Sequence, residues 1–414
     1  MWLSGYAART HASTGTFSRL SAKALALEDS KRGKVVIITT DLIGLPRAIT
    51  DVVSARLLKD HGLERSRVVF NSSHTHSGPV VKSNLSTMFD LKPEDAARVD
   101  AYSRELTEKL YTVATAALGD LAPASLSYGV GDAPFAMNRR KVVDSAVKLS
   151  DNPGGPTDHS VPVLRVTTAD GKLKAILFGY ACHNTTLTGE FYEFSADYAG
   201  FAQQAVEAAH PGATALFFLL CAGDQNPAPR SKQELAQQHG DELAAAVNKV
   251  LGGAMDPLKG QLRTAYETTE LTFAMHTRDT FEGQLNDKNL FVVRRAKQML
   301  ADYDARRPIR KTPYPVQAIR FGDGPTLVAL GGEVVIDYDL RTKREYPNAK
   351  LIVAGYSNDV MCYIPSKRVL KEGGYEAVDS MIYYGMPGPF SDQVEEQVFA
   401  AIHRVMKRVG VNNK

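Results

Sequence analysis

The feature that most constrains the fold is the regular alternation of short apolar runs with longer segments of helical periodicity. The apolar runs predicted to be strands lie at 34–39, 67–72, 173–181, 213–221, 326–330 and 350–356. The predicted helices lie at 47–59, 93–118, 197–209, 232–251, 286–303 and 391–408. This pattern favours an α/β fold in which a mixed β-sheet core is layered with helices and the active site lies at the strand carboxyl ends.

Composition indicates an ordinary globular chain of 414 residues with no internal repeat. The turn-rich stretch SDNPGGPTDHS at 150–160 is predicted to be an exposed loop rather than a linker, so we interpret residues 1–414 as a single domain. The net charge of +3 is too small to indicate a nucleic-acid partner or an anionic membrane. No stretch approaches the roughly 18 apolar residues that a transmembrane helix needs. The three cysteines are far apart and indicate neither a disulfide framework nor a CxxC metal site.

Polar side chains with metal-binding or acid–base chemistry follow five of the predicted strands. They are His74 and His76 after 67–72, His183 after 173–181, Asp224, Gln225 and Asn226 after 213–221, Glu333 after 326–330, and Asn358 and Asp359, with Tyr363 close behind, after 350–356. Sites in open α/β sheets form beyond the carboxyl ends of strands. We therefore expect these side chains to converge on one site.

The segment VVFNSSHTHSGP at 68–79 carries an HxH pair, which by itself is a weak signal for a metal and equally fits a polar loop. In an extended backbone, residues two apart point to the same side, so His74 and His76 are predicted to face one cleft. His183 follows a nearly continuous apolar strand, where a buried imidazole needs a partner or a metal. Two or three histidines and a carboxylate from separate strands form a nitrogen and oxygen set that zinc uses in catalysis.

Several motifs together resemble the neutral/alkaline (non-lysosomal) ceramidase family. They are SHTHSGP at 73–79, CHNTTLTGEFYEFSADYAGFA at 182–202, GDQNP at 223–227, GGE at 331–333, and the tract at 357–377 with SND, CYIPS and GGYEA. They occur in the family's order and span most of the chain. The resemblance implies a ceramidase-like catalytic domain over 1–414 that uses zinc to cleave a linear amide bond, as in sphingolipid and other lipid metabolism.

The resemblance also implies roles for individual residues. The implied Zn²⁺ ligands are His74, His183, Glu333 and Tyr363. On the substrate side, the resemblance implies that His76 lies near the oxygen that gains charge and that Arg139 helps to hold that oxygen or the substrate. Tyr375 matches a second active-site tyrosine. The residues alone would not have selected Tyr363 over Tyr356 as a ligand.

The sequence departs from the family at Asn226, which stands where the ceramidases have serine in GDxSP. A neutral carboxamide is a poor nucleophile, so we expect zinc-activated water to attack the substrate. Asp224 would orient that water or shuttle its proton, or else serve as a structural turn residue. The chain also ends soon after 391–408, which leaves no room for the family's C-terminal immunoglobulin-like domain. We therefore expect a shorter branch whose substrate differs from ceramide.

Three functions remain open on the sequence. The first is a zinc-dependent hydrolase of an N-acyl amide, acting on a small-molecule or lipid-like acyl substrate. The second keeps the zinc but cleaves an ester, a lactone or a carbohydrate-linked acyl group. The third is a zinc-retaining binding protein without turnover. The family resemblance implies a secreted or periplasmic protein, although the start, MWLSGYAART, shows no leader pattern.

Overall fold

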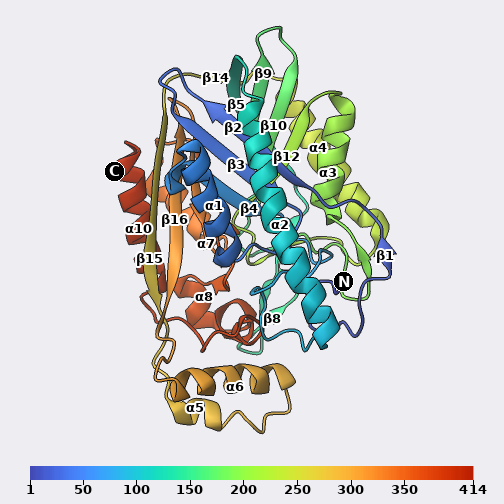
Figure 1. The fold of residues 1–414 in the computed structure, drawn as a ribbon, viewed down its shortest axis with the longest axis vertical. Helices are drawn as coiled ribbons and strands as arrows, with labels where there is room; N and C mark the ends of the chain where they lie inside the picture. The colour runs from blue at the N-terminus through green and yellow to red at the C-terminus, as the bar shows by residue number, and fades with distance from the viewer. Residues whose placement is uncertain (414) are drawn as a thin grey trace.

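The computed structural model describes residues 1–413 and contains three main β-sheets with helices on their outer faces (Figure 1). The first sheet consists of β2 (Ala22–Glu28), β3 (Lys34–Thr40) and β4 (Val68–Ser72). The second has the order β12 (Thr214–Leu219), β10 (Leu173–Tyr180), β9 (Ser160–Thr168), β5 (Ala124–Asp132) and β14 (Asp256–Leu258). The third has the order β15 (Leu262–Thr272), β16 (Lys311–Phe321), β17 (Thr326–Leu330) and β19 (Leu351–Ala354). Both parallel and antiparallel pairs occur, so the predicted mixed α/β class is confirmed.

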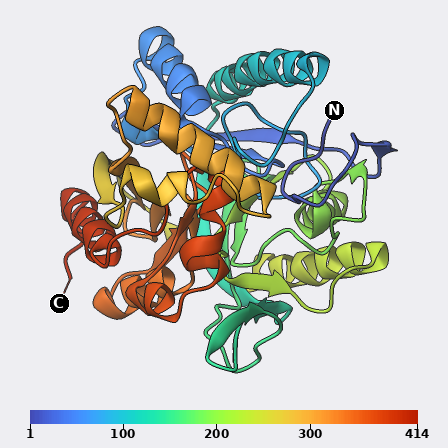
Figure 2. The ribbon, with the colours of Figure 1, turned by 90° about the horizontal axis from the view of Figure 1, so that it is seen from below.

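The helices cover these sheets as separate layers. The longer ones are α1 (Arg47–His61), α2 (Pro93–Gly119), α3 (Asp197–Ala209), α4 (Gln233–Leu251), α6 (Leu290–Asp304) and α10 (Val394–Arg408), and the shorter ones are α5 (Arg278–Glu282), α7 (Asp337–Glu345), α8 (Lys367–Glu372) and α9 (Met381–Tyr384). α1 and α2 cover the first sheet, α3 and α4 the second, and α10 lies against β15 and β16. α5 and α6 extend from the lower end of the molecule in Figure 1. In the view from below in Figure 2, α6 is the orange helix that lies across the front of the ribbon. None of the helices within residues 1–413 combines the length and apolarity that a bilayer crossing requires.

The strands that were predicted from continuous apolar runs are buried on both faces, which explains why they could be predicted from the sequence. In β3, Val35 and Ile37 join the central core, whereas Val36 and Ile38 pack under α1 and α2. Alternate side chains of a strand point to opposite faces, so a strand between two apolar layers has no polar positions. β10 behaves in the same way between the central core and the layer of α3 and α4.

Sequence reasoning missed several strands, the longest being β5, β9, β15 and β16. β15 has one largely solvent-facing side, with the sequence LRTAYETTELT, and so lacks an apolar run. β16 contains Pro313 and Pro315, which argue against a central strand, yet both residues are paired in register with β15. The predicted helix at 286–303 begins later, at Leu290, because the Asn289 side chain accepts a hydrogen bond from the Phe291 backbone N–H and caps the helix there.

One buried asparagine connects the three sheets at the edge where the site forms. The Asn71 side chain, at the end of β4, donates hydrogen bonds to the carbonyls of Leu219 (3.1 Å) and Gly355 (3.0 Å). Its Oδ1 accepts a hydrogen bond from the Leu219 backbone N–H at 2.7 Å. β4, β12 and β19 therefore end at one place. Each of these strands runs parallel to a neighbour, so its carboxyl end faces the same region.

Candidate metal centre and active-site cavity

His74 and His76 lie on a tight turn after β4. His74 adopts a left-handed backbone (φ 61°), and its N–H donates to the Leu42 carbonyl at 2.9 Å. The prediction of an extended backbone at this segment is therefore wrong. The turn nevertheless brings the two rings together, with centroids 4.8 Å apart and Nε2 atoms 3.1 Å apart. Both imidazoles face the same space, as predicted, but a tight turn rather than an extended strand places them there.

Backbone carbonyls orient the two most buried histidines. His74 Nδ1 lies 2.5 Å from the Ile43 carbonyl, and His183 Nδ1 lies 2.6 Å from the Ala222 carbonyl. A carbonyl only accepts hydrogen bonds, so Nδ1 carries the proton in both rings and Nε2 keeps its lone pair. Both Nε2 atoms face Glu333 Oε2, at 2.9 Å from His74 and 3.1 Å from His183. A hydrogen bond from Nδ1 to a backbone carbonyl, with Nε2 directed at the site, is typical of histidines that ligate metals.

Glu333 and Tyr363 reach the same point from two short neighbouring strands. β18 (Glu333–Val334) pairs in parallel with β20 (Tyr363–Ile364), with Glu333 opposite Tyr363. The Tyr363 hydroxyl lies 3.1 Å from His183 Nε2. Glu333 Oε1 accepts a hydrogen bond from the Tyr384 hydroxyl, which leaves Oε2 facing the histidines. Tyr356 also approaches, with its hydroxyl 3.4 Å from Glu333 Oε2.

The electrostatics of the cluster favour metal-binding protonation states. Burial lowers the pKa of His183 to about 3 and holds the pKa of His76 well below its usual value. Burial raises the pKa of Glu333, but the neighbouring His74 and His183 outweigh it and hold that pKa well below its usual value. Neutral imidazoles and an ionised carboxylate are the forms that ligate metals.

These residues fit a zinc ion by their chemistry. Candidate donor atoms of His74, His76 and His183 all lie within 4.8 Å of one another. Two imidazole lone pairs that face one carboxylate oxygen in a buried site need a shared cation or proton between them. A set of histidine nitrogens with carboxylate oxygen suits Zn²⁺ in a catalytic site. The histidine group includes His76, which the sequence interpretation assigned to the substrate instead.

Arg139 contacts the cluster from the junction of β6 (Ala136–Asn138) and β7 (Arg140–Val143). Its guanidinium donates to the Tyr363 hydroxyl (2.9 Å), Glu376 Oε1 (2.8 Å) and Asn226 Oδ1 (3.1 Å). Burial lowers the pKa of Arg139, but the oxygens of Tyr363 and Glu376 outweigh it and hold that pKa well above its usual value. A fixed positive charge therefore lies beside the Tyr363 oxygen.

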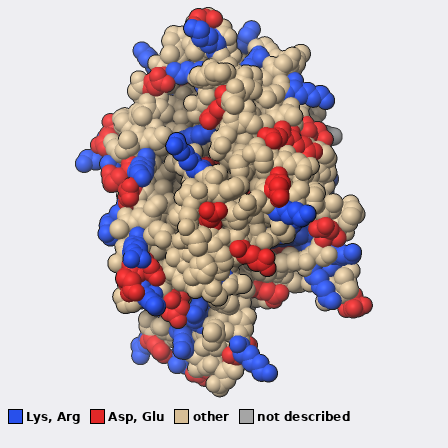
Figure 3. Space-filling model, turned by 90° about the vertical axis from the view of Figure 1, so that its right-hand side faces the viewer, with Lys and Arg blue, Asp and Glu red and all other residues tan. Residues whose placement is uncertain are grey.

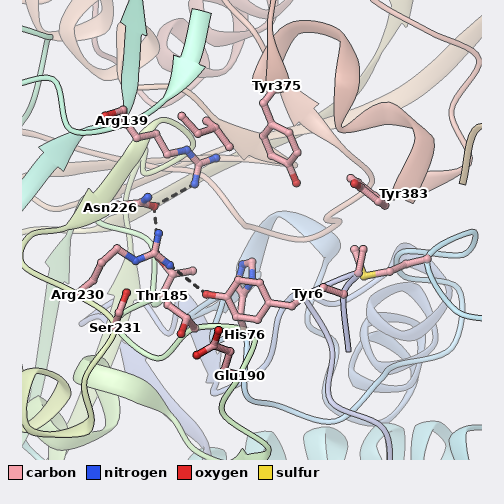
Figure 4. Close-up of a pocket in the computed structure, with 18 of the residues that line it drawn as sticks. Tyr6, His76, Arg139, Thr185, Glu190, Asn226, Arg230, Ser231, Tyr375 and Tyr383 are labelled. Carbon is pink, nitrogen blue, oxygen red and sulfur yellow. Dashed lines mark hydrogen bonds between the residues drawn. The ribbon is translucent and has the colours of Figure 1, made fainter. Parts of the chain in front are cut away.

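A large cavity opens in front of the cluster (Figure 4), with a volume of about 1180 Å³. The expected site residues that line it are His76, Arg139, Asn226, Tyr363 and Tyr375. The Tyr375 hydroxyl points into this space, and its ring centroid lies 5.5 Å from that of Tyr363. The structure thus brings together the residues expected on the metal side and the substrate side.

Asp224 lies behind this cavity, outside its lining. One of its oxygens accepts a hydrogen bond from the Ile336 N–H (2.8 Å) and the other accepts one from the Asn138 amide (3.1 Å). Its backbone carbonyl also accepts the Arg139 N–H at 2.9 Å. These contacts favour the structural alternative for Asp224. Asn358 and Asp359, which follow β19, likewise face away: Asn358 bonds Gln317, and Asp359 accepts the Arg47 N–H.

Several residues around the site were not foreseen from the sequence. Glu376 bridges Arg139 and Arg140, and Tyr384 holds Glu333. Gly5, with φ 95°, packs so closely on His76 that a Cβ there would lie 2.5 Å from the ring. The YEA tract already contained Glu376, but a lone glutamate beside a tyrosine carries no local signal.

Fold and site together define an α/β protein whose buried histidine and carboxylate centre opens into a large cavity. The family model described as neutral/alkaline non-lysosomal ceramidase, N-terminal, matches residues 1–225. The chain therefore belongs to the neutral/alkaline non-lysosomal ceramidase family.

Individual relatives agree with this assignment over most of the chain. The chain is similar to the neutral ceramidase of Pseudomonas aeruginosa, with 23% identity over an alignment of 470 residues in length. The alignment covers 95% of this chain and 68% of that protein. The crystal structure of neutral ceramidase from Pseudomonas aeruginosa aligns with a TM-score of 0.73 at 19% identity, covering 100% of this chain and 72% of that chain. A ceramidase complexed with C2 aligns with the same TM-score at 17% identity, covering 100% of this chain and 73% of the other. These structural matches support the fold.

Proposed function

We propose that the protein is a zinc-dependent hydrolase that cleaves the amide bond of an N-acyl substrate. The observation that carries the proposal is the convergence of His74, His183 and Glu333 on one point, with Tyr363 beside them and Arg139 at the cavity wall. Family membership supports hydrolysis of an amide, and the donor set supports zinc.

In this proposal His74, His183, Glu333 and Tyr363 hold the zinc. Zinc bound there would polarise a carbonyl oxygen and lower the pKa of a bound water to about 7. The Ile43 and Ala222 carbonyls keep the two histidine lone pairs directed at the site. Burial raises the pKa of Tyr363 well above its usual value, and the Arg139 guanidinium, which donates to the Tyr363 oxygen, partly offsets this rise.

The substrate side consists of His76, Arg139 and Tyr375, which face the cavity. A donor aimed at the oxygen that gains charge is typically worth about 10²–10³ in rate. The Tyr375 hydroxyl points into the cavity, and partial burial raises its pKa, so it stays a donor at neutral pH. Asn226 accepts a hydrogen bond from Arg139 and one from Thr185 Oγ1 (3.3 Å), which orients the guanidinium.

We infer that residues 1–414 form one catalytic domain. The largest apolar cluster draws buried side chains from Leu25 in β2 to Val409 after α10, so the N-terminal and C-terminal thirds share one core. Cutting such a core would expose apolar surface on both pieces.

Metal analysis combined with amide hydrolysis tests the proposal. Protein purified without added metal should contain close to one zinc per chain, and His183→Ala should lose most of it. His403→Ala, a change of the same kind on α10, should keep it. The variants His76→Ala, Arg139→Ala and Tyr375→Ala should keep zinc but lose about 10²–10³ in rate.

Full zinc retention in both His74→Ala and His183→Ala would overturn the metal assignment. Stoichiometric zinc with turnover of O-acyl but not N-acyl substrates would support the ester alternative, and stoichiometric zinc without turnover of either would support the binding-protein alternative.

A further inference from the structure

The cavity in front of the histidine cluster has a lining of mixed polarity with few aliphatic side chains. Its aliphatic lining is limited to four side chains, Ala7, Ala8, Met88 and Leu149. Five tyrosines supply aromatic surface, and serine, threonine, asparagine and arginine side chains supply polar groups. A long aliphatic chain gains affinity by burying methylene groups against apolar walls. This lining offers a long aliphatic chain few aliphatic walls, and its polar groups can bind a substrate that carries polar or charged groups.

Arg230 is the arginine in this lining whose charge is not balanced by an ion-pair partner. Among residues 1–413, no carboxylate lies within ion-pair distance of it, whereas Arg139 is paired with Glu376 at 2.8 Å. One terminal nitrogen of Arg230 donates to the Tyr6 hydroxyl at 3.2 Å, and its buried Nε has no hydrogen-bond partner. A half-buried guanidinium with unused donors is suited to a planar anion.

Tyr6 fixes how far Arg230 lies from the reacting centre. The Tyr6 hydroxyl accepts the hydrogen bond from Arg230 and donates to the Leu187 carbonyl at 2.9 Å. The ring of Tyr6 packs on that of His76, with centroids 4.7 Å apart. Arg230 is thus separated from the histidine cluster by the length of one tyrosine side chain. Figure 4 shows Arg230 and Arg139 on the same side of the cavity.

Two carboxylates, Asp151 and Glu190, also line the cavity, and both are exposed. Exposed charges are screened by water and salt much more than partly buried ones. The charges on the solvent face shown in Figure 3 are likewise mixed in sign. Selection for charge inside the cavity therefore depends mainly on Arg230.

We propose that the substrate is an N-acyl compound that carries an acidic group, a carboxylate or a phosphate, and that Arg230 binds this group. The inference rests on the proposed amide hydrolysis and names its substrate class. Arg230 then determines specificity without contacting the reacting bond.

Binding of ligands that cannot be hydrolysed tests the role of Arg230 independently of turnover. The probes are 4-oxoheptanoate and 4-oxoheptanamide, ketones of equal length that differ in charge, titrated by calorimetry into the zinc-loaded protein. We expect the acid to bind about 10–100-fold more tightly, as a charge-assisted hydrogen bond implies. Arg230→Gln should abolish this ratio and Arg230→Lys should keep part of it. Arg104→Gln, the same change on an exposed position of α2, should leave it unchanged.

Turnover then separates this inference from the proposed function. The paired substrates are N-butanoylglycine with N-butanoylglycinamide, and N-butanoylethanolamine phosphate with N-butanoylethanolamine. Hydrolysis of each compound is measured by the amine that it releases. Preference for the carboxylate or the phosphate member identifies which acid is used. Equal binding of acid and amide, or an equal loss of both in Arg230→Gln, would overturn the inference. Binding that depends on Arg230 without cleavage of any amide would refute the proposed function and leave the inference standing.

Discussion

Replacing Glu376 by glutamine should be one of the most damaging single changes near the site. Glu376 is fully buried, and its two oxygens accept hydrogen bonds from Arg139 Nε (2.8 Å) and an Arg140 terminal nitrogen (2.5 Å). Both arginine side chains are themselves buried, with 8% of Arg139 and 1% of Arg140 exposed. Removing one partner of a buried ion pair leaves an uncompensated charge and typically costs about 3–5 kcal/mol. We expect Glu376→Gln to lower the free energy of unfolding by that amount.

Glu372→Gln is the matched control. Glu372 also accepts a hydrogen bond from Arg140, at 3.0 Å, but its side chain is 28% exposed. Ion pairs that reach solvent contribute about 0–1 kcal/mol. Urea unfolding at one fixed zinc concentration measures both variants, which keeps the contribution of metal binding equal. A cost for Glu376→Gln within 1 kcal/mol of that for Glu372→Gln would refute the reasoning that this carboxylate holds the two arginines.

Two further predictions concern the packing and the joining of the sheets. Gly5→Ala should reduce hydrolysis about 10²-fold with zinc retained, because its Cβ would displace the His76 ring. Gly62→Ala, also at positive φ (65°) but with open space around it, should affect stability alone, and equal activity of the two variants would contradict this explanation. Asn71→Leu should lower the free energy of unfolding by about 3 kcal/mol, since it removes the side chain that bonds both the buried N–H and the buried carbonyl of Leu219. Urea unfolding measures this, and a loss below 1 kcal/mol would mean that Asn71 does not join the sheets.

The sequence was informative where burial leaves a local pattern. β3, β4, β10 and β17 were predicted within a residue or two, because strands buried on both faces form continuous apolar runs. β15 and β16 were missed because one is polar on its outer side and the other contains two prolines. Their pairing is set by tertiary contacts with α10 and β17, which a local pattern does not record.

The same distinction applies to the site. The convergence of His74, His183 and Glu333 could be predicted because each follows a recognisable strand, and the structure brings the three side chains together. Tyr363 was selected through the family resemblance, and Tyr356, which also approaches Glu333, shows why the residues alone left that choice open. Supporting residues such as Gly5 come from segments remote in the chain, and their contacts exist only after folding.

Asp224 offers a test that separates a structural role from a catalytic one by pH. Burial raises its pKa to about 7, against about 3.9 in an unfolded chain. The folded protein therefore binds this proton more tightly, so the contribution to stability is complete below about pH 4 and is lost as the pH rises through about 7. A pKa rise of that size corresponds to about 4 kcal/mol.

Asparagine at position 224 does not titrate. The difference in unfolding free energy between wild type and Asp224→Asn should therefore shift against the wild type from pH 4 to pH 8, by up to about 4 kcal/mol. Because both Asp224 oxygens are bonded to Ile336 and Asn138, away from the cavity, amide hydrolysis in this variant should stay within about tenfold of wild type. A proton shuttle contributes about 10²–10⁴. A pH-independent stability difference, together with a rate loss above 10² at full zinc occupancy, would therefore indicate that Asp224 transfers a proton in catalysis and would contradict its structural role.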